Sequence, residues 1–185
     1  MNNTFTTEEK DFLIKLAKDS VDTFIRTGKV VSINEVPENL KAQLACFVTI
    51  YRKGELRGCI GTIEPYDMLY KSVIENAISS ATRDMRFDCV KEDELKNLTY
   101  EVSVLTRPQE IGFTSKDELF EKIKGKGVTI EKGYFRSTYL PQVWEHFSDE
   151  ADFLSSLCRK AGLSGNEWKK LDKSGIRFSV YNTYQ

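Results

Sequence analysis

The side chain best suited to covalent chemistry is Cys59, in the stretch Leu56-Arg57-Gly58-Cys59-Ile60-Gly61-Thr62. Arg57 precedes the cysteine by two residues, and glycines stand at positions 58 and 61. Glycine within a strand marks a bulge, a bend or a close approach by another group. Because side chains alternate along a strand, we expect Arg57 and Cys59 to share a face, where the guanidinium would favour the thiolate. The stretch is therefore either a reactive or ligand-facing site, or a tightly packed structural crossing.

Three other side chains are candidates for the same site. Glu64 follows the predicted strand and fits either a general base or a solvated strand end. Arg86 lies in a charged connector, where it could bind an anion or pair internally. His146 is the only histidine, so any Cys-His mechanism needs it, although a lone histidine near Trp144 also fits a hydrogen-bonded structural residue. The predicted catalytic residues are Cys59, Arg57 and Glu64, and the predicted ligand-binding residues are Gly58, Gly61, Thr62, Arg86 and His146.

The other cysteines do not suggest a metal site. Cys46 and Cys158 fall on apolar faces, Cys89 lies among charges, and no pair has C-x-x-C spacing. A zinc site needs clustered cysteine and histidine ligands. The chain also lacks a phosphate loop and a G-x-G-x-x-G motif. We therefore expect no metal, no cofactor, and free thiols in a reducing compartment.

Composition narrows the classes of partner. The chain has 185 residues, 27 Lys and Arg against 28 Asp and Glu, and 40% hydrophobic residues. These values predict one globular domain with a real core and argue against nucleic acid as a partner, since no large basic surface is expected. The apolar runs are too short to span a bilayer, and the N-terminus does not resemble a signal peptide. We therefore expect a cytoplasmic protein that does not enter a membrane.

The hydrophobic pattern places Cys59 on the second arm of a β-hairpin. Strands are expected over residues 43–51 and 56–63, joined by a Lys53-Gly54 turn. A helix beginning after Thr6 precedes the hairpin, and a helix over residues 67–82, a short helix over 91–97 and a strand over 98–106 follow it.

The order hairpin, long helix, short helix and strand occurs over about residues 42–106 and again over about 126–183. The second hairpin opens this repeat. It turns at Lys132-Gly133, with arms over residues 128–131 and 134–140. A helix opening at Ser115 precedes it. A helical turn over residues 141–146, helices over 149–160 and 166–170 and a strand over 176–181 follow. We expect antiparallel or mixed sheets flanked by helices, a possible ββααβ duplication, and a ligand site in a cleft between the two halves.

Five segments resemble the AMMECR domain family, also described as protein A of the AmmeMemoRadiSam system. The stretch from Leu56 to Gly61 is similar to its signature hexapeptide. The remaining matches are Ala81-x-x-Asp84-x-Arg86-Phe87, the strand Glu101 to Leu105, Leu140-Pro141-Gln142-Val143-Trp144, and the run from Phe153 to Trp168. Two positions depart from the family pattern: Gly125-Lys126-Gly127 lacks a histidine, and Asp88-Cys89 replaces a proline.

The resemblance implies an α+β fold in one domain over residues 1–185. It has a larger lobe from both chain ends, a smaller lobe inserted between them, and the hexapeptide near the cleft. It also implies genomic company with Memo-like and radical-SAM proteins, and so a shared modification pathway. The family supplies no established reaction.

Two hypotheses of function follow. In the first, Cys59 is a nucleophile or carrier thiol that Arg57 activates, and a small molecule or protein binds in the cleft. In the second, the protein is a non-catalytic adaptor that uses the same cleft, or residues 141–146, to bind a partner protein.

Overall fold

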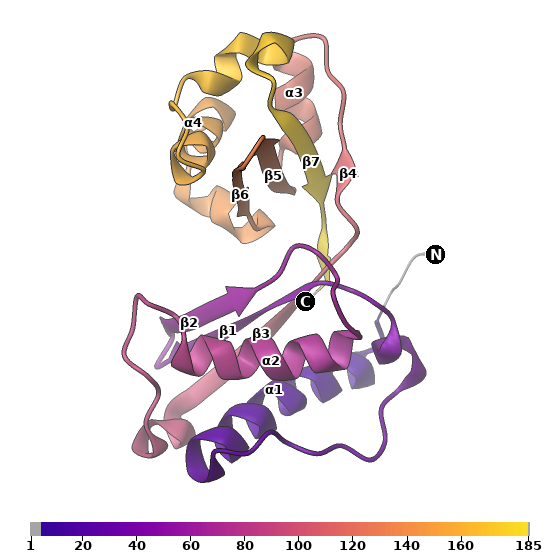
Figure 1. The fold of residues 1–185 in the computed structure, drawn as a ribbon, viewed down its shortest axis with the longest axis vertical. Helices are drawn as coiled ribbons and strands as arrows, with labels where there is room; N and C mark the ends of the chain where they lie inside the picture. The colour runs from indigo at the N-terminus through magenta and orange to yellow at the C-terminus, as the bar shows by residue number, and fades with distance from the viewer. Residues whose placement is uncertain (1–4, 185) are drawn as a thin grey trace. The chain divides into compact units, whose positions relative to one another are not determined.

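The computed structural model describes residues 5–184 (Figure 1). The chain forms two compact units: unit 1 comprises Met1–Leu105 with Tyr184–Gln185, and unit 2 comprises Thr106–Thr183. Each unit combines helices with a four-stranded sheet, which confirms the α+β class. Among the described residues, no helix is long and apolar enough to cross a bilayer.

Unit 1 contains two long helices, a hairpin and a third strand. Its sheet has the order β2-β1-β3-β8, so β2 lies at an edge. Both β2 and β3 pair antiparallel with β1. The elements are α1 (Thr7–Thr27), η1 (Glu38–Lys41), β1 (Cys46–Arg52), β2 (Glu55–Gly61), α2 (Leu69–Thr82), η2 (Glu92–Asn97) and β3 (Leu98–Leu105), with β8 (Thr183–Tyr184) completing the sheet.

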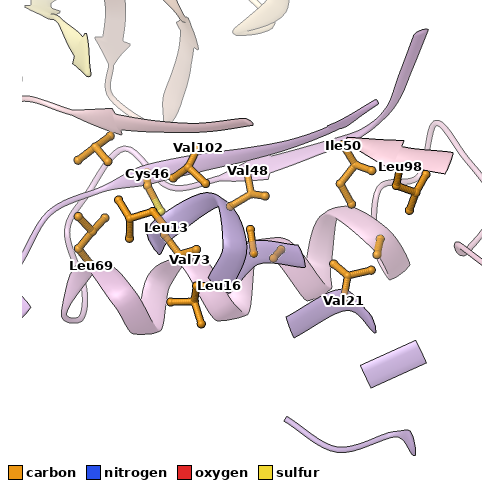
Figure 2. Packing of buried hydrophobic residues seen from close by; sticks show 14 of the residues in the cluster. Leu13, Leu16, Val21, Cys46, Val48, Ile50, Leu69, Val73, Leu98 and Val102 are labelled. Atoms are coloured by element: carbon orange, nitrogen blue, oxygen red, sulfur yellow. The ribbon is translucent and has the colours of Figure 1, made fainter. Parts of the chain in front are cut away.

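One face of this sheet packs on α1 and α2 (Figure 2). Leu13 of α1, Val73 of α2 and Val48 of β1 are among the side chains buried between the helices and the strands. The opposite face carries different side chains, because residues alternate along each strand. Phe47 of β1 lies on this opposite face, together with five polar side chains that we call the polar face: Thr49 and Tyr51 of β1, Cys59 of β2, and Glu101 and Ser103 of β3.

Local sequence signals explain where these elements begin and turn. Thr6 and Glu9 form a capping box at the start of α1, and Gly28 ends the helix in the left-handed conformation. Lys53 and Gly54 have φ values of 54° and 85°, the positive pair that a tight hairpin turn requires. The hairpin that carries Cys59 is therefore fixed by its own turn.

Unit 2 has its own sheet and core. The sheet has the order β4-β7-β5-β6, with antiparallel pairing throughout. Phe153 lies at the centre of the core, and its ring stacks on Trp144 with centroids 3.8 Å apart. The elements are β4 (Gln109–Glu110), α3 (Lys116–Ile123), β5 (Gly127–Lys132), β6 (Phe135–Tyr139), η3 (Pro141–His146), α4 (Glu150–Lys160), η4 (Glu167–Ser174) and β7 (Arg177–Tyr181).

The two units share one order of elements. In each unit a helix precedes a hairpin, and a helix, a 3-10 segment and a third strand come after it. Unit 1 has the additional segment η1 before its hairpin, and unit 2 has η3 after its hairpin. The third strand pairs with the first arm of the hairpin in both units, which gives the matching orders β2-β1-β3 and β6-β5-β7. The repeated order predicted from the sequence is therefore present in the fold.

The sequence-based boundaries differ from the structure by a few residues at several ends. The helix expected from residue 67 begins at Leu69, and the second arm expected over 56–63 ends at Gly61. The short helix expected over 166–170 is a longer segment, Glu167–Ser174, which is kinked at Leu171. Capping and turn chemistry set such ends within a residue or two, and hydrophobic periodicity does not resolve them.

Candidate functional site

A β-bulge shapes the strand that carries Cys59. Leu56 pairs with Tyr51 and Gly58 with Ile50, which leaves Arg57 as an extra residue without a partner on β1. An extra residue interrupts the alternation of side chains. The sequence predicts that Arg57 and Cys59 share a face because side chains alternate along a regular strand. The bulge breaks this alternation at Arg57, so the expected shared face is lost.

Arg57 lies on Glu94 of η2. Its Nε and Nη2 donate to the two carboxylate oxygens over 3.1 and 3.0 Å, and Arg52 adds a third hydrogen bond of 2.8 Å. The Glu94 side chain is only 7% exposed, and the hydrogen bonds from Arg57 lower its pKa. This ion-pair network borders a surface pocket of about 380 Å³, which is also lined by Phe87, Asp88, Cys89, Lys91 and Asp93.

Gly58 and Gly61 allow close packing on either side of Cys59. A Cβ atom at Gly58 would collide with the backbone carbonyl of Ser80 in α2, and one at Gly61 would collide with the Phe47 ring. The Ser80 hydroxyl accepts from the Ile60 N–H over 2.8 Å and donates to the Val48 carbonyl over 2.7 Å. Gly58 thus brings β2 directly against α2, and Gly61 makes room for the Phe47 ring of β1.

Asp84 and Arg86 hold the backbone of Cys59. The Cys59 N–H donates to Asp84 Oδ2 over 2.9 Å, and Arg86 Nη2 donates to the Cys59 carbonyl over 3.4 Å. Arg86 also binds both Asp84 oxygens, at 2.9 and 2.7 Å. Hydrogen bonds from Arg86 are the main reason that the pKa of Asp84 falls to about 2. The sequence left two interpretations of Arg86, binding of an anion or pairing within the connector. The structure shows Arg86 paired with Asp84.

The Cys59 thiol lies on the polar face, opposite Thr49. The Thr49 hydroxyl donates to Sγ over 3.2 Å. Burial raises the pKa of the thiol, and this effect outweighs the Thr49 hydrogen bond and the charge of Arg86, which both lower the pKa. Arg86, rather than Arg57, is therefore the cation that acts on this sulfur.

Glu101 on β3 completes the polar face. Thr49 pairs with Cys59 on one side and with Glu101 on the other, so the three residues form one row across three strands. Tyr51 donates to one Glu101 oxygen over 3.4 Å, and Ser103 donates to the other over 3.3 Å. The negative charge of Glu101 is one of the causes that raise the pKa of Cys59.

The remaining predicted residues are more dispersed. Thr62 follows β2 and donates its backbone N–H to the Cys46 carbonyl over 3.1 Å. Glu64 lies in the bend before α2 and is partly exposed. His146 ends η3 in unit 2 and is exposed. Within unit 1, the structure thus brings together Gly58, Cys59, Gly61 and Arg86, and it places Arg57 on Glu94.

The four cysteines are all free thiols. Cys46 and Cys158 are buried and Cys89 is exposed, in agreement with the sequence pattern. Over residues 5–184, no group of three or more His, Cys, Asp or Glu side chains is arranged to hold a metal ion.

Sequence reasoning missed Thr49, Ser80 and Glu101. Period-two alternation places Glu101 and Ser103 on one face of their strand, but it does not say which strand lies beside them. Ser80 lies inside a helix, and no local pattern marks it as the partner of β2. The contact of Ser80 with β2 and the place of Glu101 beside Thr49 both depend on packing between segments that are distant in the sequence.

Comparison with known proteins identifies the family. The AMMECR1 family profile matches residues 14–183. A protein of Methanosarcina mazei is 41% identical over 167 residues, which cover 85% of this chain and 82% of that protein. Protein MJ0810 of Methanocaldococcus jannaschii is 40% identical over 168 residues, which cover 88% of this chain and 83% of that protein.

A solved structure has the same fold. The crystal structure of the uncharacterized protein PH0010 from Pyrococcus horikoshii superposes with a TM-score of 0.89 at 35% identity, covering 97% of this chain and 91% of that one. The profile match, the relatives and this structure together show that the chain belongs to the AMMECR1 family.

Proposed function

We propose that the protein forms a covalent bond to its substrate through the sulfur of Cys59, as a nucleophile or a carrier thiol. The observation that carries this proposal is the row Cys59–Thr49–Glu101, which combines a thiol, a hydroxyl donor and a carboxylate on one sheet face. Nucleophilic cysteines work beside groups that stabilise or create the thiolate.

Each neighbour of Cys59 has a role in this proposal. Thr49 donates to the sulfur and stabilises the negative charge that develops there. Asp84 and Arg86 fix the backbone on both sides of the thiol. Gly58 is a positioning residue, because it lets β2 pack closely against α2, the helix that leads to Asp84 and Arg86. Gly61 makes room for the Phe47 ring on β1.

An acyl group is one substrate class that a nucleophilic thiol accepts. Sγ attacks the carbonyl carbon, a C–S bond forms, the bond to the leaving group breaks, and the thiol proton finishes on the leaving group. The product is a thioester on Cys59 that a second nucleophile can release. Because burial keeps the resting thiol protonated, the sulfur is nucleophilic only when a base removes its proton.

The family resemblance supports three wider proposals. We place the reaction in a modification pathway with Memo-like and radical-SAM proteins as partners. We treat the two units as lobes of one AMMECR-type domain, with the larger lobe formed from both chain ends. A cytoplasmic location is in keeping with four free thiols.

Acylation with p-nitrophenyl acetate tests the function of Cys59. We expect p-nitrophenolate release together with a 42 Da adduct that peptide mass spectrometry locates on Cys59, a mass set by replacing the thiol hydrogen with acetyl at about 42 Da. The matched control is Cys89→Ser, which removes the exposed thiol and should leave the adduct in place. Acylation of Cys89 alone in the wild-type protein would overturn the proposal.

A further inference from the structure

Building on the proposed function of Cys59, we propose that Glu101 is the base that accepts the proton of its thiol. The two residues belong to the same row of the sheet, with Thr49 between them. Neighbouring strands lie about 4.8 Å apart, so the two Cα atoms are roughly 10 Å apart, with both side chains on the same face. A glutamate side chain and one bridging hydroxyl or substrate atom can span that gap.

The Glu101 carboxylate is held in place by hydroxyl groups. Tyr51 donates to Oε2 and Ser103 donates to Oε1, so each oxygen has a donor from the polar face. Ser103 is buried and comes from the same strand as Glu101. These bonds restrict the rotation of a flexible side chain, which a proton acceptor requires.

Unit 2 contains the same row without the reactive groups. The sequence Val48-Thr49-Ile50 of β1 recurs as Val128-Thr129-Ile130 of β5, with matching positions in the two sheets. Thr129 pairs with Thr138 where Thr49 pairs with Cys59. The hydroxyl of Thr129 donates to Thr138 over 3.1 Å, close to the 3.2 Å of the Thr49–Cys59 bond.

The third position of the row also differs between the units. Thr129 pairs with Ser179 of β7, and Ser179 therefore occupies the place of Glu101. Thr138, Thr129 and Ser179 show that hydroxyl side chains alone satisfy the packing of this row. Unit 1 has instead a thiol at one end and a carboxylate at the other, and these two groups are the pair that proton transfer needs.

Burial and the charges around Cys59 together favour the protonated thiol, which a base would have to deprotonate. Arg86 is the cation that lowers its pKa, whereas Asp84 and Glu101 raise it, and Tyr51 is also near. Burial is the largest influence and keeps the sulfur protonated. During attack, the S–H bond breaks, its electron pair forms the C–S bond, and the proton moves to Glu101 and then to the leaving group.

Glu101→Gln tests this inference, in a Cys89→Ser background that leaves no other exposed cysteine among the described residues. The amide keeps an acceptor for Ser103 or Tyr51 and removes the charge. We expect acylation of Cys59 by p-nitrophenyl acetate at neutral pH to fall by a factor of about 10² to 10⁴. The pH midpoint of Cys59 alkylation by iodoacetamide should move down, since a nearby negative charge is removed.

A lower acylation rate in spite of a larger thiolate fraction separates a base from a structural residue. Glu101→Asp keeps the charge and should recover part of the acylation rate, and Glu55→Gln removes a charge at the exposed start of β2 and should change neither measurement. An acylation rate that stays equal or rises with the thiolate fraction in Glu101→Gln would refute Glu101 as the base and leave the role of Cys59 intact. An absence of Cys59 acylation in the wild-type protein would instead refute the proposed function.

Discussion

Gly58→Ala should strongly destabilise unit 1, because the substitution adds an atom where β2 meets α2. A Cβ atom at this position would lie much less than 3.0 Å from the carbonyl oxygen of Ser80, closer than Cβ atoms approach other heavy atoms in proteins. That oxygen belongs to the backbone of α2 and cannot rotate away, so β2 and α2 must separate by roughly 1 Å in a close-packed region. The movement weakens the hydrogen bonds that the Ser80 hydroxyl makes to Ile60 and Val48.

The magnitude follows from these contacts. Overpacking costs about 1 to 3 kcal/mol, and each of the two lost hydrogen bonds costs about 1 kcal/mol. We therefore expect the free energy of unfolding of unit 1 to fall by about 3 to 5 kcal/mol. Gly112→Ala is the matched control, because Gly112 has no atom within 4 Å of its ideal Cβ and no positive φ. Its expected effect is within about 0.5 kcal/mol.

Buried thiols provide an assay for each unit. Cys46 is fully buried in unit 1, and Cys158 is fully buried in unit 2. Labelling of Cys46 with a thiol reagent in dilute urea reports the opening of unit 1, with Cys158 as the reference in the same molecule. Gly58→Ala should accelerate Cys46 labelling by a factor of about 10² or more. Labelling within threefold of the wild-type rate would show that β2 and α2 do not pack as described.

Three further predictions concern charge and packing. Arg57→Ala should leave the pH midpoint of Cys59 alkylation unchanged, whereas Arg86→Ala should raise it, because Arg57 pairs with Glu94 and Arg86 acts on the thiol. The reverse pattern would contradict this assignment of the two arginines. The pKa of Asp84 is depressed from 3.8 to about 2, so the ionised carboxylate contributes about 2 kcal/mol to stability above pH 3.8, and this contribution is lost as the pH falls towards 2. Unfolding measured as a function of acid pH should show this loss in the wild-type protein and not in Asp84→Asn. Phe153→Ala should destabilise unit 2 by about 3 to 5 kcal/mol, because the ring is buried and stacks on Trp144. Urea unfolding followed by tryptophan fluorescence measures this cost, since both tryptophans lie in unit 2, and a value below about 1 kcal/mol would contradict the packing.

Local signals in the sequence predicted the elements of the fold well. Lys53-Gly54 specifies its own tight turn, and Thr6 with Glu9 specifies the start of α1, because these preferences act over four residues or fewer. The bulge at Arg57 could not be predicted from alternation, since alternation assumes a regular strand. The site was predicted only in part for the same reason.

The partners of Cys59 come from segments distant in the sequence. Asp84 follows α2 and Glu101 lies on β3, so their positions depend on how the helix and the third strand pack on the hairpin. The equivalence of Cys59 and Thr138 is hidden in the sequence because the bulge at Arg57 adds one residue between Thr49 and Cys59. Only the pairing register aligns Thr49 with Thr129 and reveals that Cys59 and Thr138 occupy equivalent positions.

The contacts of Asp84 and Arg86 restrict how a substrate can reach Cys59. An edge strand normally offers its free N–H and C=O groups to an incoming strand. At Cys59 the N–H is bound by Asp84 and the carbonyl by Arg86, so a peptide cannot add to β2 at this point by backbone pairing. A substrate must therefore approach the sulfur across the surface of the sheet, where side chains rather than backbone groups select what binds.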